Sequence, residues 1–141
     1  MEPTLYLIMR SDIQDGNPGK MMVQAAHAQA EVDAYMEEKL SSNKTGFGRL
    51  PGPSGLLDDY AKWRDGRAFG RTIVLSATEE IIKKIAMFEG PYSSTIDPSY
   101  PWENYYGELQ LTQEITCGWA FVWGRTPQEL LSLLSELDLH Q

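Results

Sequence analysis

The sequence predicts an α/β fold, in which helices cover both faces of a small mixed sheet of about four to five strands in a three-layer α/β/α arrangement. Short apolar runs, typical of buried strands, alternate along the chain with amphipathic stretches that favour helices. The chain has 141 residues, of which 42% are hydrophobic, and this is enough to build one packed core. We therefore expect residues 1–141 to form a single folded domain and not a disordered chain.

The first half of the chain is predicted to hold one strand, one long helix and a long excursion. Residues 5–9 (LYLIM) form a short apolar run that indicates a buried strand, and residues 15–19 (DGNPG) have the composition of a turn. Residues 20–40 are rich in Met, Ala, Gln, Glu and Lys, which favour a helix. Residues 41–70 are predicted as loop around a short helix near 56–63. An excursion of this length in a small domain is usually functional or mobile.

The second half of the chain is predicted to hold the remaining strands and two helices. The strands are expected at 72–76, 92–96, 108–116 and 119–123. A helix is expected to begin at Thr78, with acidic residues in its first turn, and to end at Gly90. The run 97–101 (DPSYP) is expected to break the third strand. The last helix is expected to have Thr126 as its cap and Pro127 at its first position.

The charge distribution limits the classes of partner. The formal net charge is −8, which argues against a protein that coats nucleic acid, since phosphate contacts need Lys and Arg. Residues 39–71 differ from the rest of the chain, because they hold seven basic and three acidic residues. Two interpretations stay open for this segment: a solvated loop with scattered charges, or a local attraction for an anionic partner.

The chain shows no sign of export or membrane insertion. It has no stretch of 18 apolar residues, and its N-terminus is acidic where a secretory signal is basic. Its single cysteine, Cys117, excludes a disulfide framework and a cysteine-rich zinc site. The expected location is the reducing cytoplasm.

The start of the 20–40 helix is the stretch most suggestive of chemistry. A glycine-containing turn leads into a helix N-terminus, where free backbone N–H groups and Lys20 together favour an anion. This is not a phosphate-binding Walker A loop, because Met21 stands where Ser or Thr is required. An exposed capping lysine is the alternative interpretation of Lys20.

A line of four polar residues continues along the same predicted helix. Lys20, Gln24, His27 and Glu31 are spaced +4, +3 and +4, which places them in one narrow stripe among small apolar residues. The stripe indicates either a functional groove or the solvated face of an amphipathic helix. His27 taken by itself is more typical of a partly buried, hydrogen-bonded histidine than of a catalyst.

These residues carry a resemblance to a known family. Residues 5–12 (LYLIMRSD) and 19–28 (GKMMVQAAHA) resemble the opening of the peptidyl-tRNA hydrolase 2 family. That family has a first strand ending in Arg-Thr-Asp-Leu and a first helix beginning Gly-Lys-x-Ala-Ala-Gln-x-x-His-Ala. The order of later elements is also similar, and Pro91 precedes Asp97 by six residues as in the family. The resemblance is close over residues 5–28 and looser over most of the remaining chain.

The chain departs from the family pattern at three places. The family continues after its Asp with Ala-Gly-x-Thr-Gln, whereas Asp97 is followed by an insertion at 98–106. Trp119 stands where the family usually has a threonine, so the threonine contribution does not carry over. The 41–70 excursion is longer than in the family. A diverged enzyme and a relative that has lost its activity both fit this pattern.

The resemblance implies hydrolysis of the ester bond between a peptide and tRNA, with no metal and no other cofactor. Lys20 and Asp97 carry over as the catalytic residues: Lys20 would stabilise the oxyanion or a phosphate, and Asp97 would orient or activate water. The residues expected to bind substrate are Gly19, Gln24, His27, Tyr100 and Trp102, the last two as stacking surfaces for the terminal bases.

Other interpretations of these residues stay open. Asp97 is also compatible with a simple Asp-Pro turn. The aromatic residues between 100 and 106 fit either a packed loop or a contact in a homodimer. Trp119 and Trp123 are expected in the core, and Cys117 is expected to be a buried spectator rather than a nucleophile.

The expected partner is peptidyl-tRNA, with neither DNA nor a membrane. Two further classes of function stay open on the same fold. One is a catalytically inactive module that binds a protein through an acidic and aromatic surface. The other is an RNA-binding module that uses the basic segment 39–71.

Overall fold

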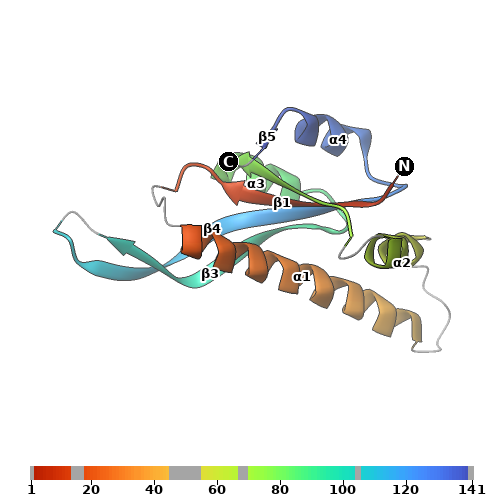
Figure 1. The fold of residues 1–141 in the computed structure, drawn as a ribbon, viewed down its shortest axis with the longest axis horizontal. Helices are drawn as coiled ribbons and strands as arrows, with labels where there is room; N and C mark the ends of the chain where they lie inside the picture. The colour runs from red at the N-terminus through yellow and green to blue at the C-terminus, as the bar shows by residue number, and fades with distance from the viewer. Residues whose placement is uncertain (1, 14–17, 45–54, 67–69, 104–105, 140–141) are drawn as a thin grey trace.

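The fold is a mixed five-stranded sheet with two helices on each face (Figure 1). The computed structural model describes residues 2–13, 18–44, 55–66, 70–103 and 106–139. The strands are β1 (Thr4–Arg10), β2 (Thr72–Ala77), β3 (Tyr92–Glu103), β4 (Leu109–Val122) and β5 (Asp138–Leu139). The helices are α1 (Pro18–Lys44), α2 (Leu56–Gly66), α3 (Glu79–Ala86) and α4 (Gln128–Ser135). Within the described ranges, no helix combines the length and the apolar character needed to cross a membrane.

The strands lie in the order β3-β4-β1-β2-β5. β1 pairs in parallel with β2 and antiparallel with β4, so the sheet is mixed, as the sequence predicted. One apolar cluster packs α1 and α2 against one face, and a second packs α3 and α4 against the other. The predicted three-layer α/β/α arrangement is therefore confirmed.

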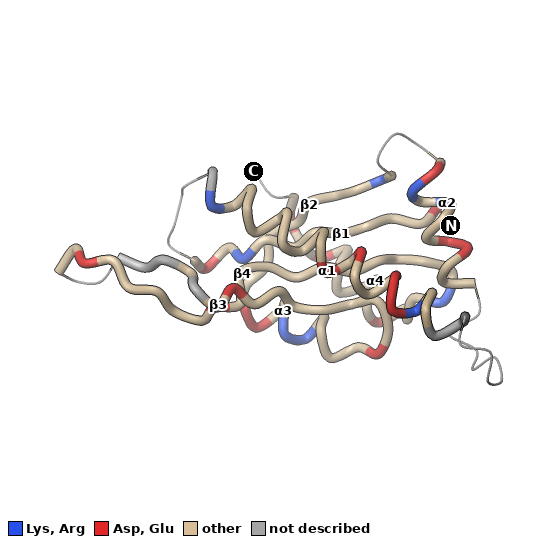
Figure 2. The backbone as a smooth tube through the Cα atoms, turned by 90° about the horizontal axis from the view of Figure 1, so that it is seen from below, with Lys and Arg blue, Asp and Glu red and all other residues tan. Residues whose placement is uncertain are grey.

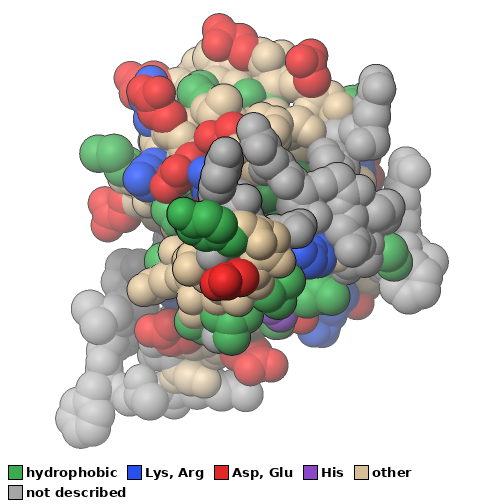
Figure 3. All heavy atoms as spheres, turned by 90° about the vertical axis from the view of Figure 1, so that its left-hand side faces the viewer, with side chains coloured by type: hydrophobic (Ala, Val, Ile, Leu, Met, Phe, Trp, Pro, Cys, Tyr) green, Lys and Arg blue, Asp and Glu red, His purple; other side chains and the backbone are tan. Residues whose placement is uncertain are grey.

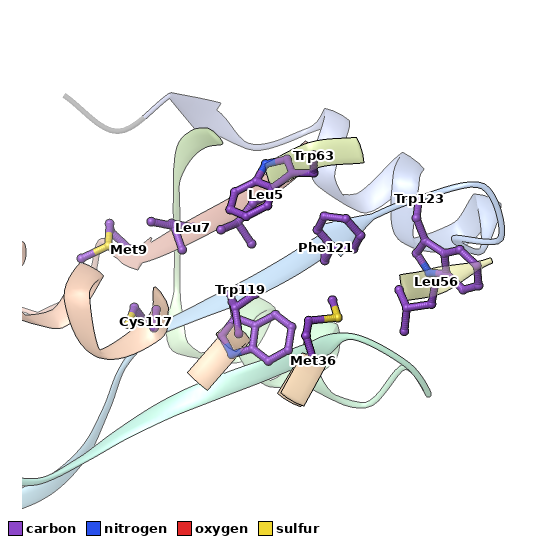
Figure 4. Close-up of a cluster of buried hydrophobic side chains, with 12 residues drawn as sticks. Leu5, Leu7, Met9, Met36, Leu56, Trp63, Cys117, Trp119, Phe121 and Trp123 are labelled. Carbon is purple, nitrogen blue, oxygen red and sulfur yellow. The ribbon is translucent and has the colours of Figure 1, made fainter. Parts of the chain in front are cut away.

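The core beneath α1 and α2 is built around three aromatic residues near the end of β4 (Figure 4). Trp119, Phe121 and Trp123 recur at every second position and are 0–4% exposed, which confirms that they belong to the core. Trp63 of α2 lies edge-on to Phe121, with 6.1 Å between ring centroids. This contact attaches the helix of the 41–70 excursion to the sheet.

The third strand is not broken at the Asp-Pro run, and that prediction was wrong. β3 continues to Glu103 and pairs with β4 through a register shift between Asp97 and Tyr100. Proline is tolerated here because β3 is the edge strand of the sheet, where one side of the strand needs no backbone donors. The insertion at 98–106 thus lengthens a β-hairpin, although residues 104–105 lie outside the described residues.

The two strands expected at 108–116 and 119–123 are one strand, β4. Gly118, between them, does not interrupt it but gives room to α3. A Cβ at this position would lie 2.9 Å from Cγ2 of Ile82 and 3.1 Å from the Ser93 carbonyl oxygen. The glycine is therefore a packing residue and not a strand end.

Several other boundaries differ from those expected. α1 extends four residues beyond residue 40 to Lys44, and the short β5, paired with β2, was not foreseen. Pro127, not Thr126, is the N-cap of α4, because the Thr126 hydroxyl accepts a hydrogen bond from the Trp123 N–H at 2.9 Å. The predicted cap of α3 is confirmed, since the Thr78 hydroxyl accepts from the Ile81 N–H.

Candidate functional site

Gln24, a buried side chain in the first half of α1, joins the helix to the two strands beneath it. Its Nε2 donates to Oδ2 of Asp97 on β3 at 2.8 Å. Its Oε1 accepts from the Thr116 hydroxyl on β4 at 2.6 Å. Gln24 is 4% exposed and Thr116 is 2% exposed, so the bond between them lies in the interior.

The direction of these bonds follows from the chemistry of the groups. An ionised carboxylate only accepts hydrogen bonds, so Gln24 presents its NH2 group to Asp97. Its carbonyl oxygen then faces Thr116, whose hydroxyl must donate. The result is a directed chain, Thr116 to Gln24 to Asp97, that holds the Asp97 carboxylate in one orientation.

A bulge in β4 turns Thr116 toward α1. Thr95 of β3 pairs with Cys117, and the next residue of β3, Ile96, pairs with Ile115, so Thr116 is an extra residue in β4. In a regular strand, neighbouring side chains point to opposite faces. Here both Thr116 and Cys117 hydrogen-bond to Gln24, the first through the amide and the second through the backbone carbonyl.

A second bulge, in β3, turns Tyr100 to the same face. Asp97 pairs with Glu114 and Tyr100 with Thr112, so β3 has one extra residue between these pairs. Residues three apart normally face opposite ways, but the extra residue brings Tyr100 onto the α1 side with Asp97. Nζ of Lys20 lies 5.7 Å from the centroid of the Tyr100 ring, and this ring is 1% exposed.

Lys20 and Gln24 are one helical turn apart on α1. Lys20 contacts Tyr100 and Gln24 contacts Asp97, and these two residues of β3 lie on either side of the bulge. An ammonium group and a carboxylate from distant parts of the sequence are thereby brought to one end of α1. We name the group of Lys20, Gln24, Asp97, Tyr100 and Thr116 the candidate site.

A second polar contact lies about two turns beyond Gln24 along α1. Oε2 of Glu31 accepts from the Thr95 hydroxyl at 3.0 Å and from the Trp119 indole N–H at 3.1 Å. Thr95 and Trp119 are 1% and 2% exposed. These bonds fix the rotation of α1 over β3 and β4, which in turn sets where Lys20 and Gln24 lie.

Cys117 is buried, as predicted. Burial raises the pKa of the Cys117 thiol to about 11, so the nucleophilic thiolate is disfavoured at neutral pH. Its Sγ donates to the Gln24 carbonyl oxygen at 3.3 Å. Its side chain packs in the core beneath Gln24.

Arg10 ties the end of β1 to the neighbouring elements. Its guanidinium lies 2.7 Å from Asp12, 3.2 Å from Glu79 of α3 and 3.0 Å from Glu114 of β4. Burial alone would raise the pKa of Asp12, but the Arg10 hydrogen bond and charge hold that pKa below its ordinary value. The cluster joins the end of β1 and Asp12 to α3 and to β4, the strand that carries Thr116.

His27 lies on the exposed side of α1, and its predicted role in binding substrate stays a prediction. His27 is exposed, whereas the next residue, Ala28, is fully buried, because consecutive helical residues lie about 100° apart. Of the predicted stripe, Gln24 and Glu31 face the sheet and His27 lies outside the contact. Gln24 itself is buried and bonded to Asp97 and Thr116, and its predicted role in binding substrate stays a prediction.

For two of the predicted binding residues, Gly19 and Trp102, the structure describes only the position of the backbone. Gly19 lies in the first turn of α1, where backbone N–H groups have no partner within the helix. Trp102 pairs with Gln110 in the β3–β4 hairpin, but its side chain lies outside the described residues.

Part of the basic segment at 39–71 lies close to acidic side chains. Lys62 lies 4.0 Å from Asp59 and Arg64 lies 3.8 Å from Asp65. Acidic and basic positions both occur along α2, which shows red and blue stretches in Figure 2. This arrangement favours the solvated interpretation of the segment.

Thr116 is the site residue that sequence reasoning missed. Its hydroxyl precedes Cys117 at the start of a buried stretch of β4. A buried hydroxyl needs a hydrogen-bond partner. That requirement was the available signal.

No protein-family model matches the chain, and no curated protein matches it either. Among the described residues, no group of three or more His, Cys, Asp or Glu side chains is arranged to hold a metal ion.

Proposed function

We propose that the protein hydrolyses the ester bond between a peptide and tRNA. The observation that carries the proposal is the directed hydrogen-bond chain from Thr116 through Gln24 to Asp97, beside a lysine in the first turn of α1. Burying the side chains of Gln24 and Thr116 is costly unless each is bonded, and the residues lie where the resemblance to peptidyl-tRNA hydrolase 2 proteins implies chemistry. The fold and the residue types support this function.

Each step of ester hydrolysis has a candidate group. The Asp97 carboxylate accepts a proton from water as the water oxygen attacks the ester carbonyl carbon. The Lys20 ammonium and the N–H groups of the first turn of α1 stabilise the negative charge that forms on the carbonyl oxygen. The bond to the ribose oxygen then breaks, and this oxygen takes up a proton. Gln24 contributes by holding Asp97 in position.

The test is to incubate the purified protein with peptidyl-tRNA and to follow release of the peptide. The parent protein should release peptide, and Lys20→Ala should do so about 100- to 1000-fold more slowly, as is typical when one oxyanion donor is lost. Lys83→Ala is the matched control, because Lys83 is an exposed lysine on α3, on the other face of the sheet. Equal rates for parent and Lys20→Ala would remove Lys20 from the mechanism.

The same experiment separates hydrolysis from binding alone. A protein that binds peptidyl-tRNA without releasing peptide would be an RNA-binding module, and that outcome contradicts the proposal. RNA binding should weaken steeply as the salt concentration rises, because it depends on contacts to phosphate.

A further inference from the structure

Tyr100 lies in the insertion at 98–106, and its ring meets the start of α1. In Figure 1 the β3–β4 hairpin projects past this end of the helix. Figure 3 looks onto the same end, where hydrophobic side chains and charges of both signs lie at the surface. Tyr100 itself is only 1% exposed. An aromatic ring needs an accessible face to stack on a base, so this burial favours a role other than the predicted stacking.

The group beside the ring is the ammonium of Lys20. Its Nζ lies 5.7 Å from the centroid of the Tyr100 ring, which is within the range of a cation–π contact. Such a contact is stronger when its two groups are removed from water. The ring is buried and Lys20 is partly buried, so this condition is met on both sides. The contact joins the first turn of α1 to the insertion.

A lysine at the start of α1 needs a group that holds its ammonium. The N-terminus of a helix carries a partial positive charge, which repels a cation, and the first turn of α1 contains no acidic residue that would offset this repulsion. The lysine side chain is also long and flexible, so the backbone alone does not fix where the ammonium lies. The face of the Tyr100 ring is electronegative and buried, and it supplies a fixed surface for this charge.

One short stretch of β3 thereby holds both reacting groups of the proposed mechanism. Asp97 is bonded to Gln24, and Tyr100, beyond the bulge, lies against Lys20. Without the extra residue in β3, the Tyr100 side chain would point away from α1. The bulge thus places the ring beneath the ammonium, next to the carboxylate that would activate water.

We propose that Tyr100 is a positioning residue, which holds the Lys20 ammonium where the oxyanion of the ester forms. This inference rests on the proposed hydrolysis and adds to it a residue of the insertion. The ring acts through Lys20 and makes no contact with the ester itself. Since the ammonium is in place before the charge develops, the contact favours the transition state and not the binding of substrate.

The first test compares kcat and KM for peptide release from peptidyl-tRNA by Tyr100→Phe and Tyr100→Leu. Tyr100→Phe keeps the ring face, so its kcat should stay within about twofold of the parent value. Tyr100→Leu removes the ring face, so kcat should fall about tenfold while KM is unchanged. A higher KM with an unchanged kcat in Tyr100→Leu would assign the ring to substrate binding and overturn the inference.

A double-mutant cycle with Lys20→Ala distinguishes positioning from general damage to the hairpin. In the Lys20→Ala background no ammonium is left to hold, so adding Tyr100→Leu should lower kcat by less than about twofold. A tenfold loss in both backgrounds would mean that the ring supports the hairpin as a whole, and it would contradict the inference.

An NMR measurement separates failure of this inference from failure of the proposed function. The Hε protons of Lys20, assigned by their absence from the spectrum of Lys20→Ala, should show an upfield ring-current shift in the parent and in Tyr100→Phe but not in Tyr100→Leu. No such shift in the parent would overturn the positioning role. If the shift is present but the parent releases no peptide, the hydrolase proposal fails, and the catalytic role of the Tyr100–Lys20 contact fails with it.

Discussion

The two faces of the sheet are built on different principles. The face under α3 and α4 is packed with aliphatic and aromatic side chains. The face under α1 and α2 has an apolar core of similar kind, but it also buries Gln24, Thr95 and Thr116, three of the four buried polar residues in the described part of the chain. Buried polar groups add little net stability even when they are bonded, so their concentration under one helix points to a role other than stability.

The two faces also differ in the regularity of the strands beneath them. Both register shifts in the sheet fall in the β3–β4 pair, beside the first half of α1. Each bulge places one additional side chain, Thr116 or Tyr100, on the α1 face. The pairs of β1 with β2 and β4 continue without a shift. Irregular pairing is thus confined to the strands that carry the candidate site.

The largest expected effect is on the apolar face. Ile82 of α3 is fully buried against the sheet. Ile82→Ala should lower the free energy of unfolding by about 2–5 kcal/mol, because contacts are lost and a cavity forms. The urea midpoint measures this loss. Peptide release per folded molecule should stay unchanged, and a slower release by fully folded protein would contradict the division between the faces.

Thr116 tests the polar face. Thr116→Val keeps the shape but leaves the buried Oε1 of Gln24 without its donor, so the free energy of unfolding should fall by about 1–3 kcal/mol. Thr116→Ser restores the hydroxyl and is the matched control. Equal stability of the Val and Ser variants in urea would show that the bond to Gln24 is not made.

Cys117 provides a pH-dependent test of burial on the same face. Burial raises the pKa of the Cys117 thiol from its ordinary value of 9.0 to about 11. The folded protein therefore holds this proton more tightly than the unfolded chain does. The resulting stabilisation is complete below pH 9 and is lost as the pH rises toward 11, which amounts to about 1 kcal/mol by pH 10.

The measurement is urea unfolding at pH 8 and pH 10 for the parent protein and for Cys117→Ala, which has no thiol. The parent should lose more stability over this interval than the variant does. Identical losses would mean that the thiol titrates normally in the folded protein.

The smallest effect is expected at the surface. Lys83 and Glu79 form an i, i+4 ion pair on α3 at 3.1 Å, with side chains that are 59% and 32% exposed. Lys83→Ala should change the free energy of unfolding by less than about 0.5 kcal/mol, because solvent and side-chain entropy offset the attraction. A loss above 1 kcal/mol in the urea experiment would contradict this expectation.

Local patterns in the sequence predicted most of the fold. Short apolar runs located β1 and β2, and Thr78 with the acidic residues after it located the start of α3. These features are encoded by neighbouring residues, so they can be recognised without knowledge of the pairing. The edge position of β3 depends on the whole sheet, and for this reason the Asp-Pro run was misinterpreted as a strand end.

The candidate site was predicted only in part, for the same reason. Lys20, Gln24 and Asp97 were identified by residue type, spacing and resemblance. Thr116 was missed because a bulge shifts its side chain to the opposite face, and a bulge is a property of two paired strands. His27 shares the helical spacing of Gln24 but is exposed, and this difference could not be predicted because spacing alone does not show where the buried face of α1 ends.

The rate of peptide release from peptidyl-tRNA by Asp97→Asn, relative to the parent protein, tests the central claim most directly. The amide keeps the size of the carboxylate but cannot accept the proton of the attacking water. The account predicts release by the parent and a fall of about 100- to 10,000-fold in the variant, with the urea midpoint of the variant showing that it is folded. Release by Asp97→Asn at the parent's rate, or none by the parent itself, would contradict it.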